Sequence, residues 1–254
     1  MIVGFVGMAR SGKDTAAQII IETEQQLKGG ESVYRRDSFA APMKRLSISL
    51  FGKDSELPEN KEKEVPVDDE DLNLIIYEIA IMLAGSKGEL EQGYEYGCME
   101  WERLYAFAYA HAEEVLTKGR HGGKLSPRRF QQLVGTEIVR HLNPNYWVDR
   151  LVSDAAKYPE KITLVTDVRY QNELDVCDSV IHVKRDMDTR VHSHTSEQLA
   201  TLAQESGIAN LLKKPVPFYT VVNNGTLDDF RRQFEALALY NLSNLLVIPE
   251  GERQ

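Results

Sequence analysis

The sequence predicts an α/β fold in which helices flank a parallel β-sheet and a helical region is inserted. Short runs of apolar, β-branched residues recur along the chain, as in strands buried on both faces of a sheet. Segments with apolar residues at helical spacing alternate with these runs, which is typical of βαβ units. No internal repeat and no low-complexity tract interrupts the alternation.

The composition is that of an ordinary globular protein, with 254 residues, 42% apolar, 27% charged and a net charge of −9. Such an acidic chain is not expected to bind nucleic acid, and it must gather its arginines at one place to bind phosphates. Cys98 and Cys177 share no metal-ligand spacing and are interpreted as reduced thiols. Because no membrane helix or signal peptide is recognisable, we expect a cytoplasmic protein without a membrane partner.

The chain opens with a predicted strand at residues 2–6, a glycine-rich turn, and a helix at residues 16–27. A second strand is expected at residues 32–36. A helix is expected to begin near Pro42, because proline suits the first helical turn. Residues 52–71 are rich in Glu, Asp, Lys and Pro and lack periodicity, so they are interpreted as an exposed insertion or mobile loop.

The later elements continue the alternation. Helices are expected at residues 72–83, 99–116, 127–141, 146–158 and 228–241, and strands at residues 162–165, 180–183 and 220–222. We therefore expect a single domain over residues 1–254. It carries an inserted, partly mobile helical region at about residues 52–125 and a lid-like segment at about residues 185–197.

Residues 7–15 contain the Gly-x-x-x-x-Gly-Lys core of a P-loop, between a predicted strand and a predicted helix. Its glycines let backbone N–H groups surround phosphate oxygens, and the helix points its positive end at the same anion. Lys13 supplies a charge that can follow a transferring phosphoryl group. The strict pattern has Ser or Thr after the lysine, but here Asp14 takes that place and the hydroxyl comes at Thr15. Asp14 then acts on a metal through water or hydrogen-bonds neighbouring backbone.

Kinases, GTPases, transporters and ATPases share this loop, so the acceptor must be found elsewhere. Arg128 and Arg129 lie in the first turn of a predicted helix, and Gln132 follows one turn after Arg128. Guanidinium groups match a phosphate and an amide matches a base edge. The alternative is a surface helix with solvated arginines. Trp147 either contacts a base or a deoxyribose, or lies in the core.

Asp167 ends a predicted buried strand, at the edge of the sheet where α/β folds bind ligands. This position suits the acidic partner of a P-loop, which holds magnesium or its water. Arg169 and Glu173 follow from the same edge. The alternative is a capping aspartate paired with an arginine.

Arg185 and Arg190 follow the next predicted strand, on a segment that we expect to close over ATP. His192 and His194 lie on the same segment. Their spacing differs from the i, i+4 pair of a helical metal site, so we reject a metal site there.

Six segments, in order along nearly the whole chain, carry a resemblance to a known family. They are Arg10-Ser-Gly-Lys-Asp-Thr15, Ser38-Phe-Ala-Ala-Pro-Met-Lys44, Gln132-Leu-Val-Gly-Thr-Glu137, Trp147-Val-Asp149, Thr166-Asp-Val-Arg-Tyr-Gln-Asn-Glu173 and Val222-Asn-Asn-Gly225. Together they resemble the bacteriophage deoxynucleoside monophosphate kinases, a branch of the nucleoside monophosphate kinase superfamily. The region from residue 52 to residue 122 matches least.

The resemblance implies a three-layer P-loop NTPase fold, with Mg²⁺ and ATP as donor and a deoxynucleoside monophosphate (dNMP) as acceptor. The products would be dNDP and ADP, made in the host cytoplasm for phage DNA synthesis. The residues expected to bind ATP are Gly7, Arg10, Ser11, Gly12, Lys13, Thr15 and Arg185, and those expected to hold the metal are Asp14, Thr15 and Asp167. The residues expected to bind dNMP are Lys44, Arg128, Arg129, Gln132, Gly135, Thr136, Trp147 and Glu173. The catalytic residues would be Lys13, Asp14, Asp167 and Arg169.

The acceptor phosphate is already largely a dianion at pH 7, so the expected reaction needs no strong general base. We expect the glycine turn and the helix that carries Arg128 to face each other across a crevice. The alternatives are a kinase of another small acceptor, such as dephospho-coenzyme A, and a P-loop ATPase that drives a partner. We expect a monomer or homodimer.

Overall fold

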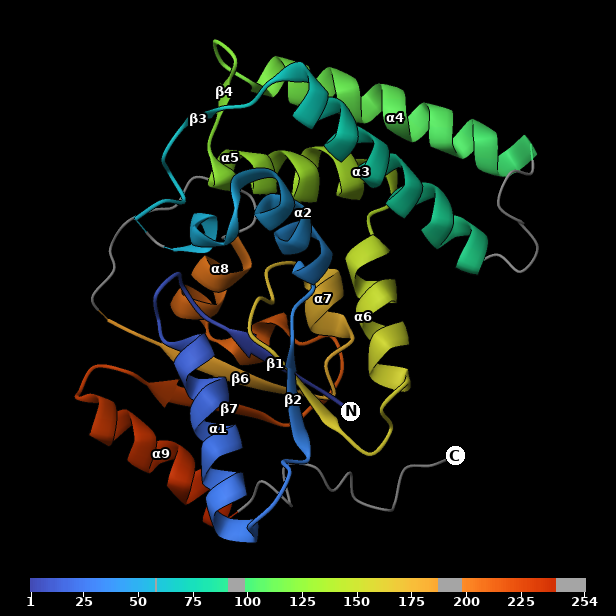
Figure 1. Cartoon of the computed structure of the whole chain (residues 1–254). Helices are drawn as coiled ribbons and strands as arrows, with labels where there is room; N and C mark the ends of the chain where they lie inside the picture. Colours follow the sequence, from blue (N-terminus) through green and yellow to red (C-terminus); the bar gives the residue numbers. More distant parts are fainter. Residues whose placement is uncertain (58, 91–98, 187–197, 241–254) are drawn as a thin grey trace. The chain divides into compact units, whose positions relative to one another are not determined.

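The computed structural model describes residues 1–57, 59–90, 99–186 and 198–240, which form parts of two compact units (Figure 1). One unit comprises Met1–Phe39 and Leu151–Gln254 and carries the parallel sheet. The other comprises Ala40–Arg150 and is mainly helical. The single-domain organisation stays a prediction. The greater part of the predicted lid, residues 187–197, lies outside the described residues.

The first unit is built on five parallel strands in the order β2-β5-β1-β6-β7. They are β1 (Ile2–Val6), β2 (Tyr34–Asp37), β5 (Ile162–Val165), β6 (Ser179–Lys184) and β7 (Phe218–Val222). Strand β1 is central, since Gly4 pairs with Val165 on one side and with Val180 on the other. A strand between two neighbours and two helical layers is buried all round, which explains its continuous apolar run.

Helices cover both faces of this sheet. Figure 1 shows α1 (Lys13–Lys28) and α9 (Leu227–Tyr240) side by side on one face. There Phe5 packs in a buried core with Ile20 and Phe234. The elements α7 (Gln171–Asp175), α8 (Gln198–Ser206) and η4 (Ile208–Leu211) also belong to this unit, and α6 (Tyr146–Ala156) begins in the other unit and ends in this one. The predicted α/β fold with a helix-flanked parallel sheet is confirmed.

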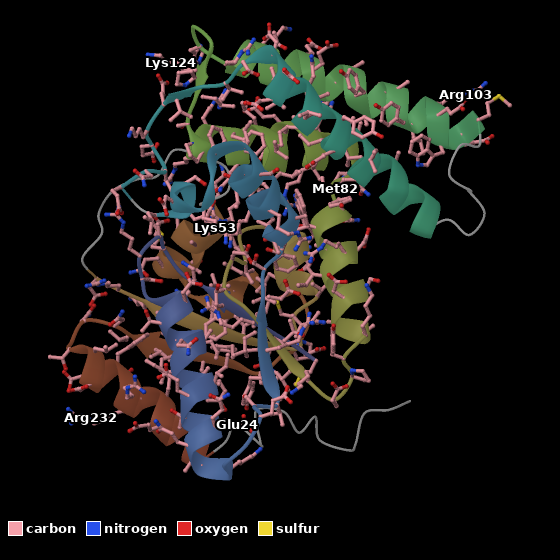
Figure 2. The ribbon with its side chains drawn as sticks, in the orientation of Figure 1. Glu24, Lys53, Met82, Arg103, Lys124 and Arg232 are labelled. Carbon is pink, nitrogen blue, oxygen red and sulfur yellow. The ribbon has the colours of Figure 1, made fainter. Side chains whose placement is uncertain are left out.

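The start of β2 is fixed by a buried carboxylate on α1. Glu24, labelled in Figure 2, is only 6% exposed and accepts a hydrogen bond from the hydroxyl of Ser32. It also accepts one from the backbone N–H of Val33 at 3.1 Å. The residues before β2 are therefore tied to α1, which sets where this strand enters the sheet.

Cys177 packs tightly against β1. A Cβ atom on Gly4 would lie 2.4 Å from the Cys177 sulfur, so glycine leaves the room that the thiol occupies. Cys177 is fully buried, and this burial, with the nearby Asp178, raises the pKa of its thiol far above the usual range.

We expect Cys177 to be inert to thiol reagents in the folded protein. The thiolate is the reactive species, and a raised pKa keeps the thiol protonated at pH 8. Alkylation at pH 8 followed by mass spectrometry of the Cys177 peptide should show modification only after denaturant is added. Rapid labelling of Cys177 without denaturant would contradict this expectation.

The second unit contains α2 (Ala41–Phe51), a helical pair, and a helix that widens part-way. The pair is α3 (Asp69–Leu90) and α4 (Met99–Gly119), which lie side by side in Figure 1. The widening helix is α5 (Pro127–Gln132), which continues as the π-helical segment η2 (Leu133–Arg140). Two short strands, β3 (Val65–Pro66) and β4 (Lys124–Leu125), form an antiparallel pair. This pair links the segment before α3 to the segment between α4 and α5. None of the described helices is long and apolar enough to cross a bilayer.

The structure adds local detail to the expectations in three places. Residues 52–71 contain the 3₁₀ turn η1 (Lys53–Glu56) and the strand β3, and they bury Ser55 and Val67. The helix expected at residues 127–141 is present, and it changes to π-helical geometry at Leu133. The short helices α7 and α8 were not foreseen, because five to nine residues give too few turns for a clear apolar period.

Candidate functional site

The glycine turn after β1 is closely fitted to the sheet. A Cβ atom on Gly7 would lie 2.4 Å from the backbone oxygen of Val183 on β6, so no larger residue fits there without a backbone shift. Gly12 has a φ of 103° and is the N-cap of α1. Lys13 extends back over the turn, and its ammonium donates to the backbone oxygens of Gly7 at 2.6 Å and Met8 at 2.8 Å. The positive charge of Lys13 therefore lies directly against the backbone of the turn.

A buried hydroxyl lies inside this turn. Ser11 is 1% exposed, and its Oγ has no hydrogen-bond partner among the described residues. A Cβ atom built on Gly7 would lie 2.8 Å from this oxygen. Buried polar atoms without partners are rare in native proteins, and binding of an ion is one physical reason for keeping one. Since α1 also begins here with its positive dipole end, the turn fits an anion such as a phosphate.

Asp14 connects the start of α1 to two strand ends. Its Oδ1 accepts hydrogen bonds of 2.7 Å from Arg36 on β2 and of 2.7 Å from the hydroxyl of Thr166, which follows β5. The carboxylate is still 73% exposed, so one side of it remains open to solvent. Neither Arg36 nor Thr166 was foreseen as a partner of Asp14. The sequence did place both residues at or near the ends of predicted strands, and the ends of parallel strands lie close together in a sheet.

The loop after β5 is held by two carboxylates. Asp167 accepts the backbone N–H of Phe39 at 3.0 Å. Glu173 is 2% exposed, and its Oε2 accepts the backbone N–H groups of Arg169 at 2.7 Å and Tyr170 at 3.1 Å. Glu173 thus fixes the main chain of this loop, whereas the side chain of Arg169 lies at the surface. The predicted roles of Arg169 in catalysis and of Glu173 in dNMP binding stay predictions.

The ends of β6 and β7 also contact the turn. Arg185 donates to the backbone oxygen of Arg10 at 3.1 Å, and Asn223 donates to that of Ser11 at 2.7 Å. Arg10 has a φ of 63°, a conformation uncommon outside glycine. Asn223 was not among the predicted site residues, although it lies in one of the matched segments. Arg190, His192 and His194 lie outside the described residues.

The first unit thus brings several predicted residues together at one edge of its sheet. They are Gly7, Arg10, Ser11, Gly12, Lys13, Asp14, Asp167, Arg169 and Arg185. Parallel strands all end at this edge, so segments distant in sequence meet there. Thr15 lies in the first turn of α1 and is exposed.

In the second unit, α5 presents two partly exposed arginines. Ser126 caps the helix by accepting the N–H of Arg129 at 3.2 Å, and Pro127 occupies the first helical position. Arg128 pairs with Glu62 at 3.2 Å, and Arg129 pairs with Glu137 at 3.4 Å. Exposed ion pairs of this kind contribute little to stability, so either guanidinium can exchange its carboxylate for a phosphate at small cost.

The π-helical segment is closely packed around Gly135. Trp147 is 3% exposed, and its indole N–H donates to the backbone oxygen of Gly135 at 3.2 Å. A Cβ atom on Gly135 would lie 2.8 Å from the sulfur of Met43. The remaining predicted dNMP residues, Lys44, Gln132 and Thr136, are half-buried on α2, α5 and η2. Such π-helical segments frequently occur at functional sites.

A protein-family comparison matches residues 1–233 to the family described as deoxynucleotide monophosphate kinase. The chain belongs to this family. It is also 29% identical over 229 residues to the deoxynucleoside-5'-monophosphate kinase of Escherichia phage T5, covering 82% of this chain and 85% of the relative. As a deoxynucleotide monophosphate kinase, the protein is a phosphotransferase acting on small nucleotide substrates. The resemblance inferred from the six segments is confirmed, and neither alternative function gains support.

Proposed function

We propose that the phosphoryl donor of this kinase is ATP, bound by the glycine turn of the first unit, and that the products are dNDP and ADP. The observation that carries the proposal is the buried Ser11 hydroxyl, unpartnered among the described residues and enclosed by a turn that begins a long helix. Lys13 lies over the same turn. In the presence of a γ-phosphate its ammonium would exchange carbonyl oxygens for phosphate oxygens.

Magnesium suits the oxygen ligands at this site. Mg²⁺ prefers oxygen, keeps several waters and commonly uses one or two protein groups together with substrate phosphates. The Thr15 hydroxyl and the carboxylates of Asp14 and Asp167 are the groups proposed to hold it. When bound, it would neutralise charge on the phosphates. The hydrogen bonds from Arg36 and Thr166 would keep Asp14 oriented.

The second unit is proposed to bind the acceptor. Arg128 and Arg129 would contact the dNMP phosphate in place of Glu62 and Glu137. Gln132, Thr136 and Lys44 would supply polar contacts to the dNMP. Gly135 and Trp147 would pack beside these residues and line the pocket. Trp147 is buried and bonded to Gly135, so its proposed role is to shape the pocket by packing.

The proposed chemistry depends on charge neutralisation and positioning. The dNMP phosphate attacks as a dianion, and its second pKa near 6 makes a general base unnecessary. Two polyanions repel each other, so the protein must supply positive charge around the transferring group. Lys13, Arg10, Arg169 and Arg185 are proposed to do this, while Glu173 keeps the Arg169 loop in place. The reaction would supply precursors for phage DNA synthesis in the host cytoplasm.

We expect Arg128→Ala to raise the KM for dNMP about tenfold and the KM for ATP less than twofold. A charge-assisted hydrogen bond is worth about 1.5–3 kcal/mol, and each 1.4 kcal/mol is a factor of ten. Steady-state ADP production with each substrate varied in turn measures both constants. Arg232→Ala is the matched control, because Arg232 is an exposed arginine on α9 paired with Asp229 (Figure 2). Equal changes in both constants would remove Arg128 from the acceptor site.

A coupled ADP assay with each dNMP and its ribose counterpart tests the proposed function. We expect ADP to form only when a monophosphate acceptor is present. ATP loss without an acceptor would indicate an ATPase instead, and ADP formation with dephospho-coenzyme A but no dNMP would indicate the other kinase reaction.

A further inference from the structure

We propose that Asn223 is a positioning residue for the ATP phosphates, an inference that rests on the proposed donor site. Asn223 directly follows β7, and its side-chain Nδ2 donates to the backbone oxygen of Ser11 at 2.7 Å. The two residues are 212 positions apart in the sequence. Asn223 touches the turn from the sheet side and would act through the backbone of the turn.

Because the peptide bond is planar, a hydrogen bond to the Ser11 carbonyl also affects the next N–H group. In a trans peptide the C=O and the following N–H point in opposite directions. A hydrogen bond that fixes the Ser11 carbonyl therefore fixes the direction of the Gly12 N–H. This N–H belongs to the N-cap of α1 and so to the donors at a helix start that have no partner within the helix. Asn223 thus aims one of the N–H groups that the P-loop offers to a phosphate.

The preceding peptide is held in the same manner. The side chain of Arg185 donates to the backbone oxygen of Arg10 at 3.1 Å. The N–H of the same peptide belongs to Ser11, and it donates to the backbone oxygen of Met8 at 3.1 Å. Two consecutive peptides of the turn are therefore fixed from outside by residues that follow β6 and β7. Without these bonds, either peptide can rotate and turn a carbonyl oxygen toward the phosphate site, which an anion disfavours.

The fit around Gly12 supports a specific contact. A Cβ atom on Gly12 would lie 2.6 Å from Nδ2 of Asn223, so the carboxamide lies directly against the turn. The strand end does not depend on this carboxamide. The backbone N–H of Asn223 donates to the backbone oxygen of Lys184 at 2.8 Å. The side-chain oxygen of the neighbouring Asn224 accepts the backbone N–H of Asp186 at 2.9 Å. Removing the Asn223 carboxamide should therefore leave the end of β7 in place.

Two substitutions test the inference. Asn223→Ala removes the carboxamide, and Asn223→Leu keeps its branched shape but cannot donate. We expect both to weaken ATP binding about tenfold by calorimetry, which corresponds to about 1.4 kcal/mol. The KM for ATP should rise in parallel while the KM for dNMP stays within twofold. Asn224→Ala, which removes a carboxamide one residue away, should leave ATP binding within twofold.

The outcomes separate this inference from the donor proposal. Wild-type affinity for ATP in Asn223→Leu would show that only packing matters and would overturn the inference. Equal rises in both KM values would assign Asn223 a general structural role and would also overturn it. If Asn223→Ala binds ATP as the wild type does, the inference fails and the donor site stands. If the wild-type protein itself binds no ATP, the donor proposal fails and the inference with it.

Discussion

Lys13→Met is expected to lower kcat at least about 1000-fold while the protein stays folded, in line with the effect of removing a charge from a transition-state site. The ammonium of Lys13 lies on the turn carbonyls of Gly7 and Met8, within reach of any anion bound there. Methionine has a similar length and no charge, so it removes the electrostatic contribution with little change in packing. ADP production with saturating dNMP and ATP measures the loss, and circular dichroism with thermal unfolding checks the fold.

Lys28→Met is the matched control for this prediction. Lys28 lies in the last turn of the same helix, and its partner Glu24 is at 3.1 Å. We expect its kcat to stay within twofold of the wild type, because Lys28 is exposed and lies at the opposite end of α1 from the glycine turn, while Glu24 keeps its hydrogen bonds from Ser32 and Val33. Comparable turnover in Lys13→Met and the wild type would remove Lys13 from the mechanism.

Gly7→Ala is expected to lower kcat/KM for ATP about 100-fold. The added Cβ would lie 2.4 Å from the Val183 oxygen and 2.8 Å from the Ser11 hydroxyl, so the turn must move away from β6. Overpacking of this kind costs about 1–3 kcal/mol, and each 1.4 kcal/mol is a factor of ten. Since the displaced atoms belong to the proposed phosphate site, we expect the shift to appear in ATP binding as well as in the unfolding temperature.

Gly30→Ala provides the same chemical change where the chain has room. A Cβ atom on Gly30 would meet nothing within 4 Å, so ATP kinetics and stability should be unchanged within error. If Gly7→Ala and Gly30→Ala behave alike, the close fit of the turn against β6 has no bearing on nucleotide binding.

The sequence was most informative where one physical cause dominates. Strands at residues 2–6 and 162–165 were predicted with the bounds that β1 and β5 have, because burial on both faces requires an unbroken apolar run. The glycine turn was recognised because its backbone needs glycine at fixed positions. Asp167 was placed at the sheet edge by the general rule for parallel strands, and the structure has it there.

The partners of these residues were not predictable in the same manner. The bond from Arg36 to Asp14 and the bond from Asn223 to Ser11 depend on strand order and register, which one sequence does not specify. Trp147 allowed two interpretations from sequence, and only packing distinguishes a buried indole from an exposed one. The π-helical geometry that begins at Leu133 and the hydrogen bond from Trp147 to Gly135 within that segment are not visible in the apolar periodicity of the sequence.

The central position of β1 has a consequence for biosynthesis. This strand is made first, yet both of its neighbours in the sheet, β5 and β6, begin more than 150 residues later. The turn that follows β1 receives a hydrogen bond from Asn223, which lies 212 positions after Ser11. During translation β1 therefore cannot form these sheet pairs until β5 and β6 have been made. Nucleotide-binding competence is then acquired late in translation, a delay typical of topologies whose contacts join distant parts of the chain.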